Sequence, residues 1–124
     1  MVLENLSVGV DIEEISRFEK YASDRNGEFI KKVYTEREAE YCFKSKHPEK
    51  HLAARFCAKE AIYKALSSLG FSKISFQDCE IINNEQGAPE VIFLSEKLRN
   101  KVRAKISLSH SRTNAIAQVI AEKL

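Results

Sequence analysis

Residues 52–66 read LAARFCAKEAIYKAL, and this stretch is the most apolar part of the chain. With 3.6 residues per turn, its apolar side chains cover most of the circumference of a helix, which is typical of a helix that is largely buried. Pro48 precedes the stretch, and proline is favoured in the first turn of a helix. We therefore predict a long buried helix over residues 49–68, opened by Pro48.

Four ionic residues interrupt this apolar helix: Arg55, Lys59, Glu60 and Lys64. At about 100° per residue, Glu60 and Lys64 lie close together one turn apart, whereas Arg55 and Lys59 share another side and predict a basic edge. A charge in apolar surroundings is costly without a partner, so Glu60 should have a counter-ion or a ligand. Taken alone, Glu60 and Lys64 could be an ordinary helix pair worth about 0.3–0.5 kcal/mol.

A second acid in apolar company lies near the N-terminus. Apolar and polar residues alternate in LSVGVD (residues 6–11), which predicts a short strand with one apolar face and with Asp11 at its C-terminal end on the other face. Ile12, Ile15, Phe18 and Ala22 then recur at helical spacing and predict an amphipathic helix. Asp11 is therefore expected at a strand-to-helix junction.

The other segments predict shorter elements. Thr35 and Glu38 match a capping box at the start of a helix, and NNEQG (residues 83–87) is typical of a hairpin turn. The expected elements are a short helical stretch near 29–33, a helix at 35–44, strands at 74–82 and 89–94, a short helix at 95–102, and strands at 106–109 and 115–121. This order predicts a single α+β domain over residues 1–124, with an antiparallel sheet packed on the long buried helix.

Composition excludes several classes of protein. The chain has 124 residues, 44% of them hydrophobic, and a net charge of +2, which fits one globular domain and is too slight to indicate a nucleic-acid partner. Cys42, Cys57 and Cys79 are odd in number and contain no C-x-x-C pair, which argues against disulfides or zinc and favours a reducing cytoplasm. No apolar run approaches the roughly 18 residues needed to span a membrane.

Five motifs follow one another along the chain: GVDI (9–12) with Ile15 and Arg17, LAARFCAKEA (52–61) with Lys64, SFQD (75–78), GAP (87–89) and SLSH (107–110). Together they resemble holo-acyl-carrier-protein synthase, the small single-domain type of 4'-phosphopantetheinyl transferase. The first two motifs are highly specific in combination. The resemblance implies transfer of 4'-phosphopantetheine from coenzyme A to a serine of apo acyl carrier protein, with release of adenosine 3',5'-bisphosphate, in fatty acid biosynthesis.

The resemblance assigns catalytic roles to three of the ionic residues. Asp11 and Glu60 match the positions whose carboxylates hold Mg²⁺ on the pyrophosphate, and Mg²⁺ usually takes only one or two protein carboxylates beside phosphate oxygens and water. Lys64 matches the lysine near the transferred phosphate, where an ammonium would neutralise developing charge and could protonate the leaving group. The base that takes the serine proton remains open between Glu60, Asp11 and a metal-bound water.

Nucleotide contacts also follow from the resemblance. Arg55 matches a position that meets the 3'-phosphate, a role that suits a planar, permanently charged guanidinium. His110 matches another nucleotide-side contact, and Gly87 and Pro89 match residues that shape the adenine side of the pocket. Lys59 could bind phosphate or lie on the solvated edge of its helix, and the residues favour neither alternative.

The family's protein partner is small and acidic, and a basic helix edge would attract it by charge complementarity. Arg17 matches the docking arginine, and the weaker candidates on the same segment are Lys20, Tyr21 and Arg25. The alternative is an ordinary solvated helix face, because that segment also carries Glu13, Glu14 and Glu19.

One departure from the family and one architectural expectation complete the sequence interpretation. Ser67-Ser68-Leu69 stands where the family usually has Gly-Thr-Gly, which leaves the path of this loop open, although Gly70 could relocate the turn. The motif set occurs once, so the resemblance implies a homotrimer with sites at the subunit interfaces. A non-catalytic module of the same fold that binds coenzyme A or carrier protein is the alternative function.

Overall fold

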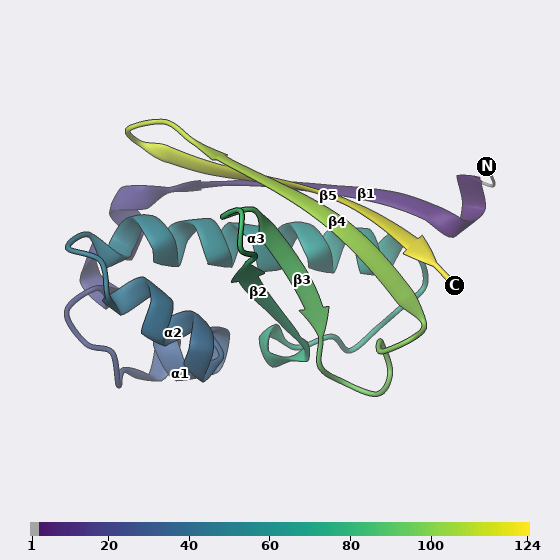
Figure 1. Cartoon of the computed structure of the whole chain (residues 1–124), viewed down its shortest axis with the longest axis horizontal. Helices are drawn as coiled ribbons and strands as arrows, with labels where there is room; N and C mark the ends of the chain where they lie inside the picture. The colour runs from purple at the N-terminus through teal and green to yellow at the C-terminus, as the bar shows by residue number, and fades with distance from the viewer. Residues whose placement is uncertain (1–2) are drawn as a thin grey trace.

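The helix expected from the apolar stretch is the central element of the fold. In the computed structural model, which describes residues 3–124, α3 spans Pro48–Ser68 with Pro48 in its first turn. It runs along the length of the molecule beneath a sheet (Figure 1). Ten of its residues are buried, from Leu52 to Leu66. The prediction of a long buried helix is confirmed.

Two antiparallel sheets accompany α3. The larger has the strand order β1-β5-β4 and the smaller is the hairpin β2-β3, while α1 and α2 lie at one end of the molecule (Figure 1). The strands are β1 (Leu6–Glu14), β2 (Cys79–Asn83), β3 (Pro89–Phe93), β4 (Val102–His110) and β5 (Asn114–Lys123). The helices are α1 (Glu28–Val33) and α2 (Glu36–Phe43), with short 3₁₀ helices at Leu3–Asn5, Ile15–Tyr21 and Phe76–Asp78. This is the expected α+β fold, and the capping box of Thr35 and Glu38 is present at α2.

Close packing fixes β1 against α3. A Cβ added at Gly9 would lie 1.9 Å from the backbone oxygen of Ala61, so only glycine permits this approach. Two residues earlier, the hydroxyl of Ser7 donates a 2.7 Å hydrogen bond to the backbone oxygen of Ala65. These contacts bring the residues that follow Gly9 next to the helix that carries Glu60.

The predicted helix after Asp11 is wrong in its first part. β1 continues to Glu14, because residues 12–14 pair with residues 114–116 of β5, and Asp11 therefore lies within a strand rather than at its end. Only from Ile15 does the backbone turn, as a 3₁₀ helix whose Ile15 and Phe18 are buried. Hydrogen bonding to a strand distant in sequence outweighed the local helical spacing.

Two other expected elements differ. The strand predicted from residue 74 begins only at Cys79, because Ser75 and Asp78 form a capping box that starts a 3₁₀ turn instead. The short helix expected at residues 95–102 is a series of turns, and Val102 already belongs to β4, where it pairs with Lys123. The hairpin turn between β2 and β3 is as predicted.

The alternation in β1 is correct, but its apolar side faces away from α3. Val8 is 68% exposed and Ile12 is 62% exposed, whereas Ser7 and Gly9 face the helix. Ile116 and Ile120, which pair with Ile12 and Val8, extend this apolar outer face onto β5. The larger sheet thus has an apolar surface that residues 3–124 of this chain do not cover.

The departure at residues 67–69 leaves the helix end well formed. Gly70 adopts φ +93°, and its N–H bonds to the backbone oxygen of Ser67 while the N–H of Phe71 bonds to that of Leu66. These two hydrogen bonds, together with a glycine in the left-handed conformation, form the Schellman motif at the end of the helix. The turn is relocated to Gly70. No helix within the described residues is both long enough and apolar enough to cross a bilayer.

Candidate active site

Asp11, Glu60 and Lys64 meet where β1 lies on α3. The Asp11 side chain is 11% exposed, and the Lys64 Nζ lies 3.2 Å from its Oδ1 and 3.0 Å from the backbone oxygen of Val10. Burial raises the pKa of Glu60, the Asp11 carboxylate raises it further, and Lys64 opposes both effects. Lys64 is therefore held by the strand acid, and a simple Glu60–Lys64 helix pair does not describe it.

A third acid, Glu13, belongs to the same group and was not predicted. Glu13 follows Asp11 by two residues along β1, so both side chains face the same side of the strand. Burial raises the pKa of Glu13 to about 7, the adjacent Asp11 carboxylate and the charge of Glu60 contribute in the same direction, and the charge of Arg17 opposes them. The alternation that could have revealed this was obscured because we expected a helix from Ile12.

The donor set fits a magnesium ion. The Oδ2 atom of Asp11 is buried without a hydrogen-bond partner, which is expensive unless a cation or donor meets it. Within residues 3–124, no three His, Cys, Asp or Glu side chains form a group that could hold a metal by themselves. Two carboxylates suffice for Mg²⁺ when phosphate oxygens and water supply the other ligands.

A cavity of about 410 Å³ borders Glu60 on the side of the 74–79 segment. Its walls are mainly apolar. The lining residues include Lys32, Glu60, Tyr63, Ile74, Phe76 and Gln77. We call Asp11, Glu13 and Glu60 the carboxylate group. Through Glu60, it lies beside a pocket that could accept part of a substrate.

Lys59, one residue before Glu60, is buried and has partners only from this chain. Its Nζ lies 2.7 Å from Glu38 Oε1 and donates to the backbone oxygens of Val33, Phe76 and Cys79. Both predicted alternatives for Lys59, a phosphate contact and a solvated edge, are wrong. The four partners come from segments remote in sequence, so local periodicity could not reveal them.

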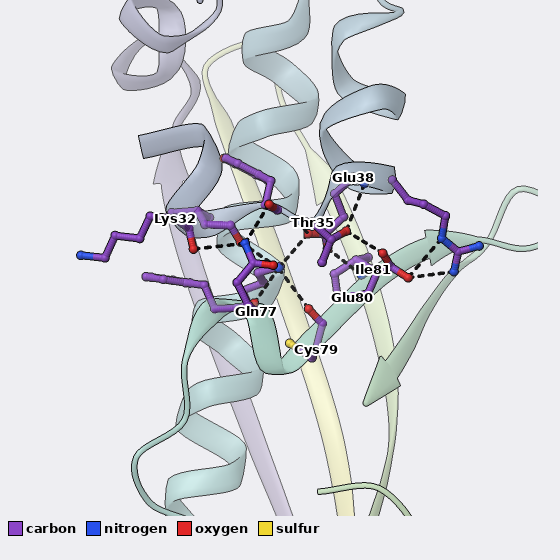
Figure 2. Close-up of polar contacts among 12 residues, drawn as sticks. Lys32, Thr35, Glu38, Gln77, Cys79, Glu80 and Ile81 are labelled. Carbon is purple, nitrogen blue, oxygen red and sulfur yellow. Dashed lines mark hydrogen bonds and ion pairs between the residues drawn. The ribbon is translucent and has the colours of Figure 1, made fainter. Parts of the chain in front are cut away.

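The acids around Lys59 are equally well satisfied (Figure 2). Glu38 accepts hydrogen bonds from the backbone N–H groups of Thr35 and Ile81, at 2.8 and 2.7 Å. Glu80 accepts from the Thr35 hydroxyl at 2.6 Å and from the guanidinium of Arg37 at 2.8 Å. We call Thr35, Glu38, Lys59 and Glu80 the buried network; it joins α2, α3 and β2, and the exposed Arg37 closes its outer side.

Arg55 is also buried, so the expected basic edge of α3 is wrong. Its guanidinium lies over the Tyr41 ring, 4.0 Å from the centroid, and donates to Asn83 Oδ1, while Asn83 Nδ2 donates 2.9 Å to the backbone oxygen of Gly87. Through Asn83, Arg55 is linked to the turn that contains Gly87. The Nε atom of Arg55 itself has no hydrogen-bond partner. The sequence marked Asn83 only as a turn residue and gave no signal for Tyr41.

Further basic groups lie near Arg55. Burial lowers the pKa of His51, and the charges of Arg55 and His110 lower it further, so these three side chains are electrostatic neighbours. His110 is exposed at the end of β4, and Gly87 turns with φ +84° two residues before Pro89 opens β3. One end of the molecule thus gathers basic side chains beside a tight turn.

The residues expected to dock a protein follow β1 in one continuous segment. Arg17 is exposed and its guanidinium lies 2.7 Å from Glu13 Oε1. The Tyr21 ring stacks on Phe29 with centroids 3.9 Å apart, and Arg25 pairs with Glu36 at 2.7 Å. The segment therefore carries two cations, of which Arg17 contacts Glu13, while Tyr21 packs against the core.

Comparisons with known proteins identify the family of this chain. The family model of the 4'-phosphopantetheinyl transferase superfamily matches residues 7–119. Holo-[acyl-carrier-protein] synthase of Clostridium tetani is 43% identical over 122 residues (94% of this chain and 95% of the relative), and that of Geotalea daltonii is 39% identical over 120 residues (93% and 96%). The crystal structure of the Bacillus anthracis holo-(acyl-carrier-protein) synthase in complex with CoA (3',5'-ADP) is similar with a TM-score of 0.77 at 32% identity, over 95% of this chain and 96% of that chain.

Proposed function

This chain belongs to the 4'-phosphopantetheinyl transferase superfamily, and we propose that it is a holo-acyl-carrier-protein synthase. It transfers 4'-phosphopantetheine from coenzyme A to a serine hydroxyl of apo acyl carrier protein, releases adenosine 3',5'-bisphosphate and serves fatty acid biosynthesis. The observation that carries this proposal is the convergence of Asp11 and Glu60 from β1 and α3, with Lys64 beside them and one Asp11 oxygen unpartnered.

Asp11 and Glu60 would hold the magnesium ion. When bound, the ion neutralises the pyrophosphate and makes its phosphorus more accessible to an oxygen nucleophile. Lys64 places its ammonium next to Asp11, where it can bind a phosphate oxygen and stabilise the charge that develops on the leaving group. The cavity beside Glu60 would accept the pantetheine arm, because its lining is mainly apolar.

Arg55 and His110 would bind the 3'-phosphate of the nucleotide. The unpartnered Nε of Arg55 supports this role, and Gly87 and Pro89 would shape the adenine side of the pocket next to it. Tyr41 covers the guanidinium and is 40% exposed, so its ring would turn aside when the phosphate binds.

Arg17, Tyr21 and Arg25 would dock the acidic carrier protein. Arg17 is 63% exposed, which lets its guanidinium reach a carboxylate on a partner. The segment lies directly after β1, so a carrier docked on it would have its serine near Asp11.

The active form would be a homotrimer with sites at the subunit interfaces. The apolar outer face of β1 and β5 supports an oligomer, because a patch with Val8, Val10, Ile12, Ile116 and Ile120 exposed is unfavourable in water. A small hollow on this face is lined by Ile12, Ser109, His110 and Ile116, so a neighbouring subunit there would complete the wall beside His110. The buried free thiols of the three cysteines fit a cytoplasmic location.

Intact-protein mass spectrometry tests the proposed reaction. Purified protein with coenzyme A and Mg²⁺ should add the mass of phosphopantetheine to an apo carrier protein, and EDTA should abolish the addition. A serine-to-alanine carrier provides the control. Binding of coenzyme A and carrier without any mass increase would reject the transferase and leave a binding module of the same fold.

A further inference from the structure

Arg55 is a buried cation without a counter-ion in the described part of the chain. It is 3% exposed, and none of the ion pairs within residues 3–124 includes it. Its Nε atom is buried and has no hydrogen-bond partner. A buried charge of this kind is costly unless an opposite charge meets it. The guanidinium is therefore suited to an anion supplied from outside.

Asn83, at the end of β2, holds this guanidinium in place. Arg55 donates from Nη2 to Asn83 Oδ1, and Nδ2 of the same amide donates a 2.9 Å hydrogen bond to the backbone oxygen of Gly87. The bond to Gly87 fixes the direction of the amide, because only its nitrogen can donate. Asn83 thus connects Arg55 to the turn between β2 and β3 through two hydrogen bonds.

The partners of Arg55 orient its guanidinium without neutralising it. An amide oxygen accepts a hydrogen bond but carries no net charge, so the positive charge stays available to a ligand. The Tyr41 ring, 4.0 Å from the guanidinium carbon, is also uncharged and holds the cation through its π face. An aspartate in place of Asn83 would instead form a charge-assisted pair and offset the charge. The amide at residue 83 therefore affects which ligands Arg55 can bind.

We propose that Asn83 is a positioning residue that sets the preference for coenzyme A over 3'-dephospho-coenzyme A: it directs Arg55 toward the 3'-phosphate and leaves the charge of Arg55 free. The inference rests on the proposed function, in which Arg55 binds that phosphate. The same amide holds the backbone of the Gly87 turn, so it also fixes the phosphate-binding cation relative to the adenine side of the pocket. Asn83 acts through Arg55 and need not contact the phosphate.

Calorimetric titration with two ligands tests this role without turnover. Coenzyme A and 3'-dephospho-coenzyme A are titrated into the protein with Mg²⁺ and no carrier, and the readout is the ratio of their dissociation constants. The ligands differ only in the 3'-phosphate, so the ratio cancels changes at the adenine and the pantetheine arm. Asn83→Asp offsets the charge of Arg55 and should lower the preference for coenzyme A about tenfold, as expected for a hydrogen bond to a charged group. Asn83→Ala frees the guanidinium without neutralising it and should lower the preference about threefold.

Asn84→Asp is the matched control, because it makes the same change of charge one residue further along. The Asn84 Oδ1 atom accepts from the backbone N–H groups of Gln86 and Ala88 at 2.9 and 3.0 Å, which an aspartate can also do. The side-chain hydrogen bonds of Asn84 stay within the hairpin. Its ratio should stay within about twofold of wild type, because salt screens charges at a surface turn. Asn83 is exposed, so its variants should keep the fold, and urea unfolding checks each protein.

Two results would overturn the proposal: the same ratio in Asn83→Asp and Asn84→Asp, or equal weakening of both ligands in Asn83→Ala, which would mean that Asn83 only supports the turn. If wild type transfers phosphopantetheine and prefers coenzyme A, either result rejects this inference alone. A wild type that transfers but binds both ligands equally rejects the assignment of Arg55 together with the inference. A wild type that transfers nothing rejects the proposed function.

Discussion

Lys59 and Glu60 are neighbours on α3, yet the surroundings of their side chains are opposite. Around Lys59, Glu38 of the buried network supplies a carboxylate, and Val33, Phe76 and Cys79 supply three backbone oxygens. Around Glu60, the nearby groups include two further acids, and an oxygen of Asp11 lacks any partner. The first arrangement is complete and serves stability, whereas the second is left unbalanced and is suited to an external cation.

The difference arises from the direction in which each side chain leaves the helix. Successive residues of a helix point about 100° apart. Lys59 is directed toward the segments around Val33 and Cys79, which offer acceptors, while Glu60 is directed toward β1, where Asp11 is. One turn of one helix thus carries, side by side, a structural charge and the charge that we propose binds the metal.

The largest effect is expected from removing the cation of the buried network. Lys59→Met leaves Glu38 charged in the interior with two backbone N–H donors but no counter-ion, and loss of one partner from a buried ion pair costs about 3–5 kcal/mol. Urea unfolding followed by circular dichroism measures this change. Lys44→Met, at an exposed pair with Glu40, is the matched control and should cost below about 1 kcal/mol. If the free energy of unfolding fell equally little in both variants, the buried network would not stabilise the fold in the way that the comparison with Glu60 indicates.

Asp11→Asn should separate function from stability. The variant keeps the shape of the side chain but removes the negative charge that a magnesium ion needs, so we expect transfer to fall by about 10²–10³-fold. Its free energy of unfolding should equal or exceed that of wild type, because repulsion toward Glu13 and Glu60 is relieved. Mass-spectrometric rates and urea unfolding give the two readouts. A variant that loses stability and retains transfer would reverse the roles of the two regions.

The sequence predicted those parts of the molecule that local patterns determine. The apolar coverage of the helix and Pro48 were sufficient to predict α3, and the capping box of Thr35 and Glu38 was sufficient to predict where α2 begins. The family motifs pointed to Asp11 and Glu60, and the charge of Asp11 raises the pKa of Glu60, so the two carboxyls lie within electrostatic reach of each other.

The rest depended on contacts between distant segments. β1 continues past Asp11 because β5 pairs with it, and that extension places Glu13 on the same face as Asp11. Lys59 looked like a surface or phosphate-binding lysine, because its partners are separated from it by 17 to 26 residues. Neither the end of a strand nor the partners of a buried charge can be inferred from spacing alone.

The smallest effect concerns pH in the metal-free protein. The pKa of Glu13 is raised to about 7, first by burial and then by Asp11, against an ordinary value of 4.5. A carboxyl whose pKa is raised in the folded state stabilises the fold fully below about pH 4.5, and this contribution is lost as the pH rises through about 7. With EDTA present, urea unfolding at pH 5 and pH 8 should therefore show that wild type loses more stability toward pH 8 than Glu13→Gln does. Glu14→Gln, which changes an exposed acid on the opposite face of β1, should keep the wild-type slope, and equal slopes for all three proteins would mean that the carboxylate group is not under electrostatic stress.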